Sequence, residues 1–368
     1  MKTYKLLTPG PLTTTDSVKR EMLFDHCTWD DDYKQITQKL RKDLLELAHV
    51  SEDEYTTIFM QGSGTFGVES VFTSVIGENE KVLICANGAY GERMEDIVTY
   101  AKIPYVIYHE HYNCVPDAKK VEAILKEDPA ITHVAMVQSE TTSGILNDIE
   151  AVGKVAKQYG KVFIVDAMSS FGGVDIPVKD WGIDFIISSA NKCIQGVPGF
   201  AFIIAKKEVL IASEGKARSL SLDLYAQWKT MDVDGKWRFT SPTHVVLAFA
   251  KAMEELKEEG GIPARNKRYT ENNHLLIERL GKLGIKPYID SVHQGPIITT
   301  FFYPEPCHFQ FADMYEYIKE RGYAIYPGKV TEAETFRIGN IGEIYQDDIE
   351  KVCDIIEEFL KNIMKYNE

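Results

Sequence analysis

Short apolar segments rich in β-branched residues alternate with segments of helical spacing along much of the chain, and this alternation restricts the fold most. The strand-like segments are residues 55–60, 81–86, 131–138, 162–165, 185–188 and 200–205. Between them, residues 67–75 and 149–159 place apolar side chains at helical spacing. Short β-branched runs between helices are typical of a buried, mostly parallel sheet. The sequence therefore predicts an α/β fold in which helices flank such a sheet.

The pattern changes after a predicted helix over residues 245–259. The segment from Glu258 to Pro263 contains two glycines and a proline, which end that helix. A long helix, several short strands and a closing helix from about Gln346 to Tyr366 follow. Because 368 residues exceed what one hydrophobic core usually serves, we expect an N-terminal segment (1–15), a large domain (16–258) and a smaller α+β C-terminal domain (259–368).

The charge and cysteine content exclude several classes of function. With 55 acidic and 41 basic residues the formal charge is −14, so the chain repels nucleic acid and anionic membranes. The six cysteines are scattered without a CxxC pair, and we expect no structural disulfide, no metal site and a cytoplasmic location. The first residues lack the apolar run of a secretion signal, and no apolar stretch approaches a membrane span.

The segment Gly62–Gly67 matches the GxGxxG pattern between a predicted strand and a predicted helix. A dinucleotide site would also need an acidic residue at the end of the next strand, but that strand is followed by Asn87. The glycines and the helix N-terminus still suit one phosphate group, to which Ser63 and Thr65 could add hydroxyl donors. The alternative is a turn that needs glycine for packing alone.

An aspartate and a lysine follow two successive predicted strands. Asp166 comes directly after the strand at 162–165, where open α/β sheets place their ligands, and its burial calls for a cationic partner. Lys192 lies 26 residues later among small, polar and apolar residues, where desolvation would make its amine nucleophilic. The protonated ring nitrogen of pyridoxal 5'-phosphate (PLP) would suit Asp166. A lone aspartate is more often a helix cap, and only the pair is specific.

Two further residues suggest ligand contacts. Tyr90, in a glycine-flanked segment after the strand at 81–86, could stack on a flat ring, although a core tyrosine is the alternative. Arg337 lies in an apolar strand-like segment of the C-terminal part, and its planar fork suits a carboxylate or a phosphonate. An internal ion pair is the alternative for this arginine.

Stretches over almost the whole chain carry a family resemblance. They are LLTPGPLTTT, DHCTWDDDY, QGSGTFGVES, NGAYGERM, QSETTSG, VDAMSSFGG, SSANKCIQGVPGFAF, SLSLDLYAQW, GKWRFTSPTH, YPGK and FRIGNIGE. By these stretches the chain resembles the 2-aminoethylphosphonate–pyruvate aminotransferases, a family in the class V group of fold-type-I PLP enzymes. The stretches NKCIQGVPGFAF and LDLYAQW are the most specific to that family.

The resemblance implies an activity and a set of roles. The activity is transfer of the amino group of 2-aminoethylphosphonate to pyruvate, and the resemblance implies a homodimer with shared active sites. Lys192 would hold PLP as a Schiff base and transfer protons, and Asp166 would pair with the ring nitrogen. The remaining implied contacts are the PLP phosphate (Ser63, Gly64, Thr65, Asn191), the ring face (Tyr90), the phenolic oxygen (Thr142), the phosphate of the neighbouring subunit (Thr240) and the substrate carboxylate or phosphonate (Arg337).

Four other functions compete with this interpretation. An alanine–glyoxylate or serine–pyruvate aminotransferase would share the PLP residues and also use Arg337. A cysteine desulfurase could use Cys307, but those enzymes usually carry histidine where this chain has Asn191. A nicotinamide-dependent dehydrogenase is disfavoured by the missing ribose-binding acid. A non-catalytic PLP-binding protein would have little need for Arg337.

Overall fold

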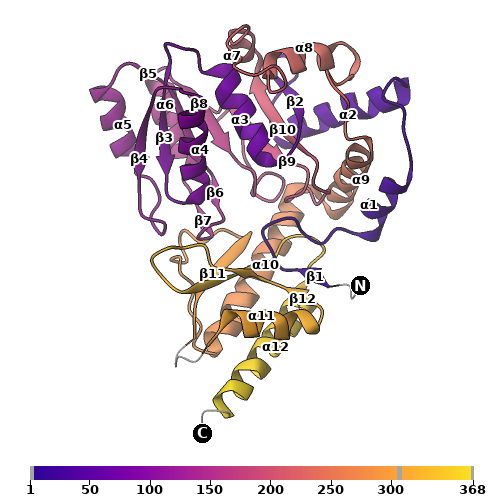
Figure 1. Ribbon diagram of the computed structural model, residues 1–368, viewed down its shortest axis with the longest axis vertical. Helices are drawn as coiled ribbons and strands as arrows, with labels where there is room; N and C mark the ends of the chain where they lie inside the picture. Colours follow the sequence, from indigo (N-terminus) through magenta and orange to yellow (C-terminus); the bar gives the residue numbers. More distant parts are fainter. Residues whose placement is uncertain (1–3, 305–308, 366–368) are drawn as a thin grey trace.

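A seven-stranded sheet forms the centre of the large upper part of the molecule (Figure 1), in a computed structural model that describes residues 4–304 and 309–365. The strand order is β2-β10-β9-β8-β5-β3-β4. The strands are β2 (Tyr55–Gln61), β3 (Lys81–Ala86), β4 (Tyr105–His109), β5 (Ile131–Val137), β8 (Val162–Asp166), β9 (Phe185–Ser189) and β10 (Phe200–Lys206). Only β10 runs antiparallel to its neighbours β2 and β9. The predicted α/β fold with a mostly parallel sheet is confirmed.

Helices cover both faces of this sheet because its strands are apolar on both faces. Along β3, Leu83 and Cys85 belong to one core cluster, whereas Val82, Ile84 and Ala86 belong to the other. The first cluster includes residues of α2 (Asp31–Leu47), α5 (Ala118–Glu127), α6 (Ile149–Gln158) and α9 (Thr243–Glu259). The second includes residues of α3 (Gly64–Val75), α4 (Ala89–Tyr100), α7 (Lys207–Ile211) and α8 (Leu224–Asp234). The result is a three-layer arrangement.

The smaller lower part in Figure 1 has its own core, built around a three-stranded sheet of order β11-β14-β13. Its elements are β11 (Ile298–Phe302), β13 (Tyr326–Pro327), β14 (Thr335–Gly339), α10 (Gly261–Lys282), α11 (Phe311–Glu320) and α12 (Gln346–Lys365). Helix α10 begins directly at Gly261, and Pro263 fits its first turn because no backbone donor is needed there.

The N-terminal segment joins the two parts. Strand β1 (Lys5–Leu6) pairs in parallel with β12 (Tyr323–Ala324) of the smaller part. The chain then reaches the larger part through α1 (Asp16–Arg20) and η1 (Glu21–Leu23), both of which contact α9. A short hairpin of β6 (Ser139–Glu140) and β7 (Ile145–Leu146) completes the described elements.

The predicted strands and helices are all present, with ends that differ by a few residues. The predicted helix at 67–75 starts three residues earlier, at Gly64, so that the second half of the Gly62–Gly67 segment forms its first turn. Tyr366, the predicted last residue of the closing helix, lies outside the described residues. The division at residues 258 and 259 stays a prediction. In the described ranges, no helix is both long enough and apolar enough to cross a bilayer.

Candidate active site

One cavity of about 490 Å³ opens where the parallel strands of the large sheet end. Strands β2, β3, β8 and β9 point their carboxyl ends to this place, which is where open α/β sheets bind ligands. Seven of the predicted site residues line it: Ser63, Gly64, Thr65, Tyr90, Asp166, Asn191 and Lys192. The structure therefore brings together side chains that are up to 129 positions apart in the sequence, from Ser63 to Lys192.

The first turn of α3 forms one wall of the cavity. Ser63 is the N-cap of α3 but makes no capping hydrogen bond, so its hydroxyl is available to a ligand. The N–H groups of a helix's first turn have no partner within the helix and attract an anion. A side chain at Gly64 would place its Cβ 2.4 Å from Met168 Sδ, so Met168 would have to move to admit it. This wall suits a phosphate group.

Ser189 is a site residue that the sequence analysis missed. Its hydroxyl is buried, lines the cavity and has no hydrogen-bond partner in the described chain. A buried hydroxyl without a partner is unfavourable unless a ligand supplies one. The signal was its place at the end of β9, three positions before Lys192.

Asp166 is the last residue of β8 and is 5% exposed. Its Oδ1 accepts a hydrogen bond from Met168 N at 2.8 Å, and burial raises the pKa of the carboxyl to about 6. Among the residues that the structure describes, no basic side chain lies within ion-pair distance of it. A protonated ring nitrogen would supply the missing positive partner, so Asp166 fits PLP.

Lys192 follows β9 and lies under the N-terminal segment. Its Nζ donates a hydrogen bond to Pro9 O at 2.7 Å, and burial lowers the pKa of the amine to about 8. At Gly10, φ is +114° and an added Cβ would lie 2.6 Å from Lys192 Cδ, so a side chain there would displace the lysine. The amine is therefore largely desolvated and easily deprotonated, as a nucleophile requires. That Pro9 and Gly10 cover this amine was not predictable from the sequence.

Tyr90 lies in the first turn of α4 with its side chain at the cavity. The buried carboxylate of Glu140 fixes this turn, because it accepts hydrogen bonds from Tyr90 N at 3.1 Å and Gly91 N at 3.3 Å. Thr142 Oγ1 donates to Glu140 at 2.5 Å and accepts from Ala89 N at 3.1 Å. Thr142 is fully buried behind α4 and does not line the cavity. Its predicted cofactor contact stays a prediction.

Arg337 lies in the middle of β14 and is 6% exposed. Its Nε donates to Pro327 O at 3.0 Å and its Nη1 to Thr141 O at 2.8 Å. These bonds hold the guanidinium but do not neutralise it, and burial lowers its pKa. Within the described ranges no carboxylate pairs with Arg337, which argues against the internal ion pair.

Thr240 does not lie at the cavity. It is exposed in the segment between α8 and α9. Its predicted partner is the phosphate bound by a neighbouring subunit, and this contact stays a prediction. Cys307, the candidate of the desulfurase alternative, lies outside the described residues.

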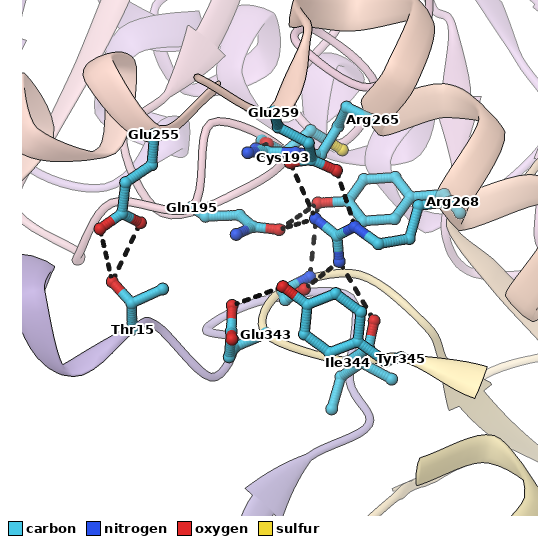
Figure 2. Close-up of polar contacts among 12 residues, drawn as sticks. Thr15, Cys193, Gln195, Glu255, Glu259, Arg265, Arg268, Glu343, Ile344 and Tyr345 are labelled. Atoms are coloured by element: carbon cyan, nitrogen blue, oxygen red, sulfur yellow. Dashed lines mark hydrogen bonds and ion pairs between the residues drawn. The ribbon is translucent and has the colours of Figure 1, made fainter. Parts of the chain in front are cut away.

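A polar network fixes the segment that follows Lys192 (Figure 2). Arg265 of α10 donates to Cys193 O at 2.6 Å and forms an ion pair with Glu259. Arg268 contacts the same Glu259 at 2.7 Å and donates to Gln195 Oε1 at 2.9 Å. Its Nη1 also donates to the carbonyls of residues 342 and 344 in the smaller part. The lysine segment is thus tied to both parts of the molecule.

Burial keeps the Cys193 thiol protonated. It is fully buried, donates to Ser169 O at 3.1 Å, and has a pKa raised by burial to about 12. A thiol with such a pKa is not a nucleophile at neutral pH.

Comparison with known proteins gives close relatives. A family model described as aminotransferase class V matches residues 25–341. A 2-aminoethylphosphonate–pyruvate transaminase from Lysinibacillus sphaericus is 56% identical over 368 residues, which are 100% of this chain and 100% of that protein. A bifunctional phosphonoacetaldehyde hydrolase/aminoethylphosphonate transaminase from Clostridioides difficile is 53% identical over 97% of this chain and 56% of that protein. The crystal structure of an alanine–glyoxylate aminotransferase from Nostoc sp. has a TM-score of 0.90 at 21% identity, covering 98% of this chain and 96% of the other.

Proposed function

The chain belongs to the class V aminotransferases, and on this basis we propose that it transfers the amino group of 2-aminoethylphosphonate to pyruvate. The products are phosphonoacetaldehyde and L-alanine. The names of full-length relatives at more than half identity support these substrates. The Clostridioides difficile relative, named also as a phosphonoacetaldehyde hydrolase, supports the aldehyde product.

We infer that PLP is the cofactor and that the cavity residues hold it. The first turn of α3 (Ser63, Gly64, Thr65), together with Asn191 and the unpartnered hydroxyl of Ser189, would bind its phosphate. Tyr90 would pack on the ring, and Asp166 would keep the ring nitrogen protonated. When bound, PLP supplies a positively charged ring that accepts the electrons released from the substrate carbon.

Lys192 carries the proton transfers in this proposal. Its amine, with a pKa of about 8, is neutral in a useful fraction of molecules near neutral pH. It removes a proton from the carbon that bears the amino group of the donor, and it later returns a proton on the other side of the transfer. Pro9 O, which accepts its hydrogen bond, orients the Nζ until the cofactor and substrate are bound.

Arg337 would bind the acidic end of each substrate. Its buried, unneutralised fork matches the carboxylate of pyruvate, and the phosphonate of the donor can use the same charge. We also propose a homodimer, in which Thr240 of each chain reaches the phosphate site of the other. Phe66 and Phe239, which adjoin Thr65 and Thr240 in the sequence, are exposed in the single chain. Large exposed apolar side chains at these two places support a surface that a second subunit covers.

The observation that carries this proposal is a lysine of lowered pKa and an unpaired buried aspartate on one cavity. Its test is the visible spectrum of the purified protein after addition of 2-aminoethylphosphonate without a keto acid. The cofactor band should bleach and should return when pyruvate is added. A protein that ignores this amine but bleaches with alanine or serine is an alanine–glyoxylate or serine–pyruvate type enzyme. A protein that cannot be loaded with PLP contradicts the roles of Lys192 and Asp166.

A further inference from the structure

Two cations beside the cavity wall face the ring of Tyr90. Lys329 Nζ lies 4.4 Å from the ring centroid, and Arg93 Cζ lies 4.9 Å from it. Arg93 also donates to Thr65 Oγ1 at 3.3 Å, so it is held at the phosphate wall. Lys329 has no hydrogen bond or ion pair to any described residue. It is a charged side chain against Tyr90, which lines the cavity, and the proposed mechanism has not used it.

Lys329 follows β13, whose partner strand β14 carries Arg337. Tyr326 of β13 is the Cα partner of Arg337 in β14, and Arg337 Nε donates to Pro327 O. The chain then turns at Gly328, whose N–H donates to Thr335 O at 2.9 Å. An added Cβ at Gly328 would lie 2.2 Å from Thr335 O, so the turn requires glycine and is tight. Lys329 therefore lies two residues after Pro327, whose carbonyl accepts the hydrogen bond from Arg337. The tight turn at Gly328 fixes the backbone that leads to it.

The charges around Lys329 leave a surplus of positive charge. Burial and the guanidinium groups of Arg93 and Arg337 lower the pKa of Lys329, while the carboxylates of Glu140 and Glu92 act in the opposite direction. Glu140 already accepts four hydrogen bonds from its own surroundings, and Glu92 accepts one from Tyr112. An anion bound between Lys329 and Arg337 would relieve the repulsion among these cations.

The two substrates of the proposed reaction differ in the charge of their acidic ends. A carboxylate carries one negative charge, which one arginine fork can match. A phosphonate has a second ionisable oxygen, as a phosphate monoester does, and approaches two negative charges as pH rises above neutral. We propose that Lys329, acting beside Arg337, supplies the second positive charge that selects a phosphonate over a carboxylate. This inference rests on the proposed function and names the group that decides its donor specificity.

Equilibrium binding of unreactive anions to the PLP-loaded protein tests this role. Ethylphosphonate and propionate lack the amino group, so isothermal titration measures only the anion subsite. We expect Lys329→Gln to weaken ethylphosphonate binding about 10- to 100-fold, the usual range for a charge-assisted hydrogen bond, and to change propionate binding little. Lys329→Arg should retain most of the preference. The matched control Lys319→Gln removes a lysine that lies 5.2 Å over the Tyr315 ring in α11, and should change neither affinity.

The pH dependence gives a second readout, which a purely structural role would not change. In the wild type, the preference for ethylphosphonate should decline as pH rises through the lowered pKa of Lys329. In Lys329→Arg this decline should disappear because arginine stays charged. Equal weakening of both anions in Lys329→Gln, or no weakening of either, would overturn the inference even if the wild type uses 2-aminoethylphosphonate. A wild type that reacts with alanine but never with 2-aminoethylphosphonate would instead overturn the proposed function.

Discussion

Asp166→Asn should stabilise the cofactor-free protein. In the PLP-loaded protein the same substitution should abolish most of the activity. Burial raises the pKa of Asp166 to about 6 from the usual 3.8. Between these two pH values the carboxyl is protonated in the folded apoprotein but already ionised in the unfolded chain. The folded apoprotein therefore loses stability as pH rises from about 4 to 6, and this loss persists at higher pH. The difference of about 2 pKa units corresponds to about 3 kcal/mol at pH 8 and about half of that at pH 5. Asparagine removes this cost and keeps an oxygen for the Met168 N–H.

The assay is urea unfolding of the PLP-free protein at fixed concentration, with wild type and Asp166→Asn compared at pH 5 and pH 8. The midpoint of the variant should exceed that of the wild type at pH 8, and the gain should shrink at pH 5. Transamination by the loaded variant should fall by at least about 100-fold, because the ring nitrogen loses its charged partner. A variant that is less stable than wild type at pH 8 would refute the reasoning that Asp166 is an unpaired buried charge.

Three further outcomes follow from the same cavity. Gly10→Ala should slow amino transfer by about 10-fold or more, because its Cβ would meet Lys192 at 2.6 Å on a backbone of φ +114°; an unchanged kcat would contradict this placement of the N-terminal segment. Ser189→Ala should weaken PLP binding by about 10-fold, measured by titration of the apoprotein, yet leave apoprotein stability unchanged or higher; full PLP affinity would remove Ser189 from the phosphate site. In the apoprotein, acylation of Lys192, followed by peptide mass spectrometry, should rise with pH to half its maximum near pH 8, whereas a midpoint above pH 10 would show a solvated lysine.

The sheet and its site were predictable because both depend on local signals. A buried parallel strand is a short β-branched run, and its carboxyl end is marked by the first polar or glycine residue that follows. Asp166 directly after β8 and the Gly62–Gly67 segment after β2 are such marks. The antiparallel direction of β10 was not predictable, since strand direction depends on the connection and leaves no periodic trace in the strand itself.

Contacts between distant segments could not be derived from spacing. Pro9 O meets Lys192 across 183 positions, and Glu140 holds the turn of Tyr90 across 50. Neither Pro9 nor Glu140 is unusual where it stands in the sequence, so only the folded arrangement gives each a role. Ser189 differs, because a hydroxyl at the end of β9 near Lys192 was a local signal. The roles of Thr142 and Thr240 stay predictions, since one lies behind α4 and the other depends on a second chain.

The overall charge and the site have opposite signs, and this contrast explains how an acidic chain can take an acidic substrate. A formal charge of −14 opposes the approach of a dianion, so local groups must provide the attraction. Most cations in the described chain cannot do so, because carboxylates already engage them; Arg265 and Arg268, for example, share Glu259. Arg337 and Lys329 differ in being held by carbonyls and by the turn at Gly328, neither of which cancels their charge. Neutral anchors fix these cations without neutralising them, and we propose that the substrate uses their charge.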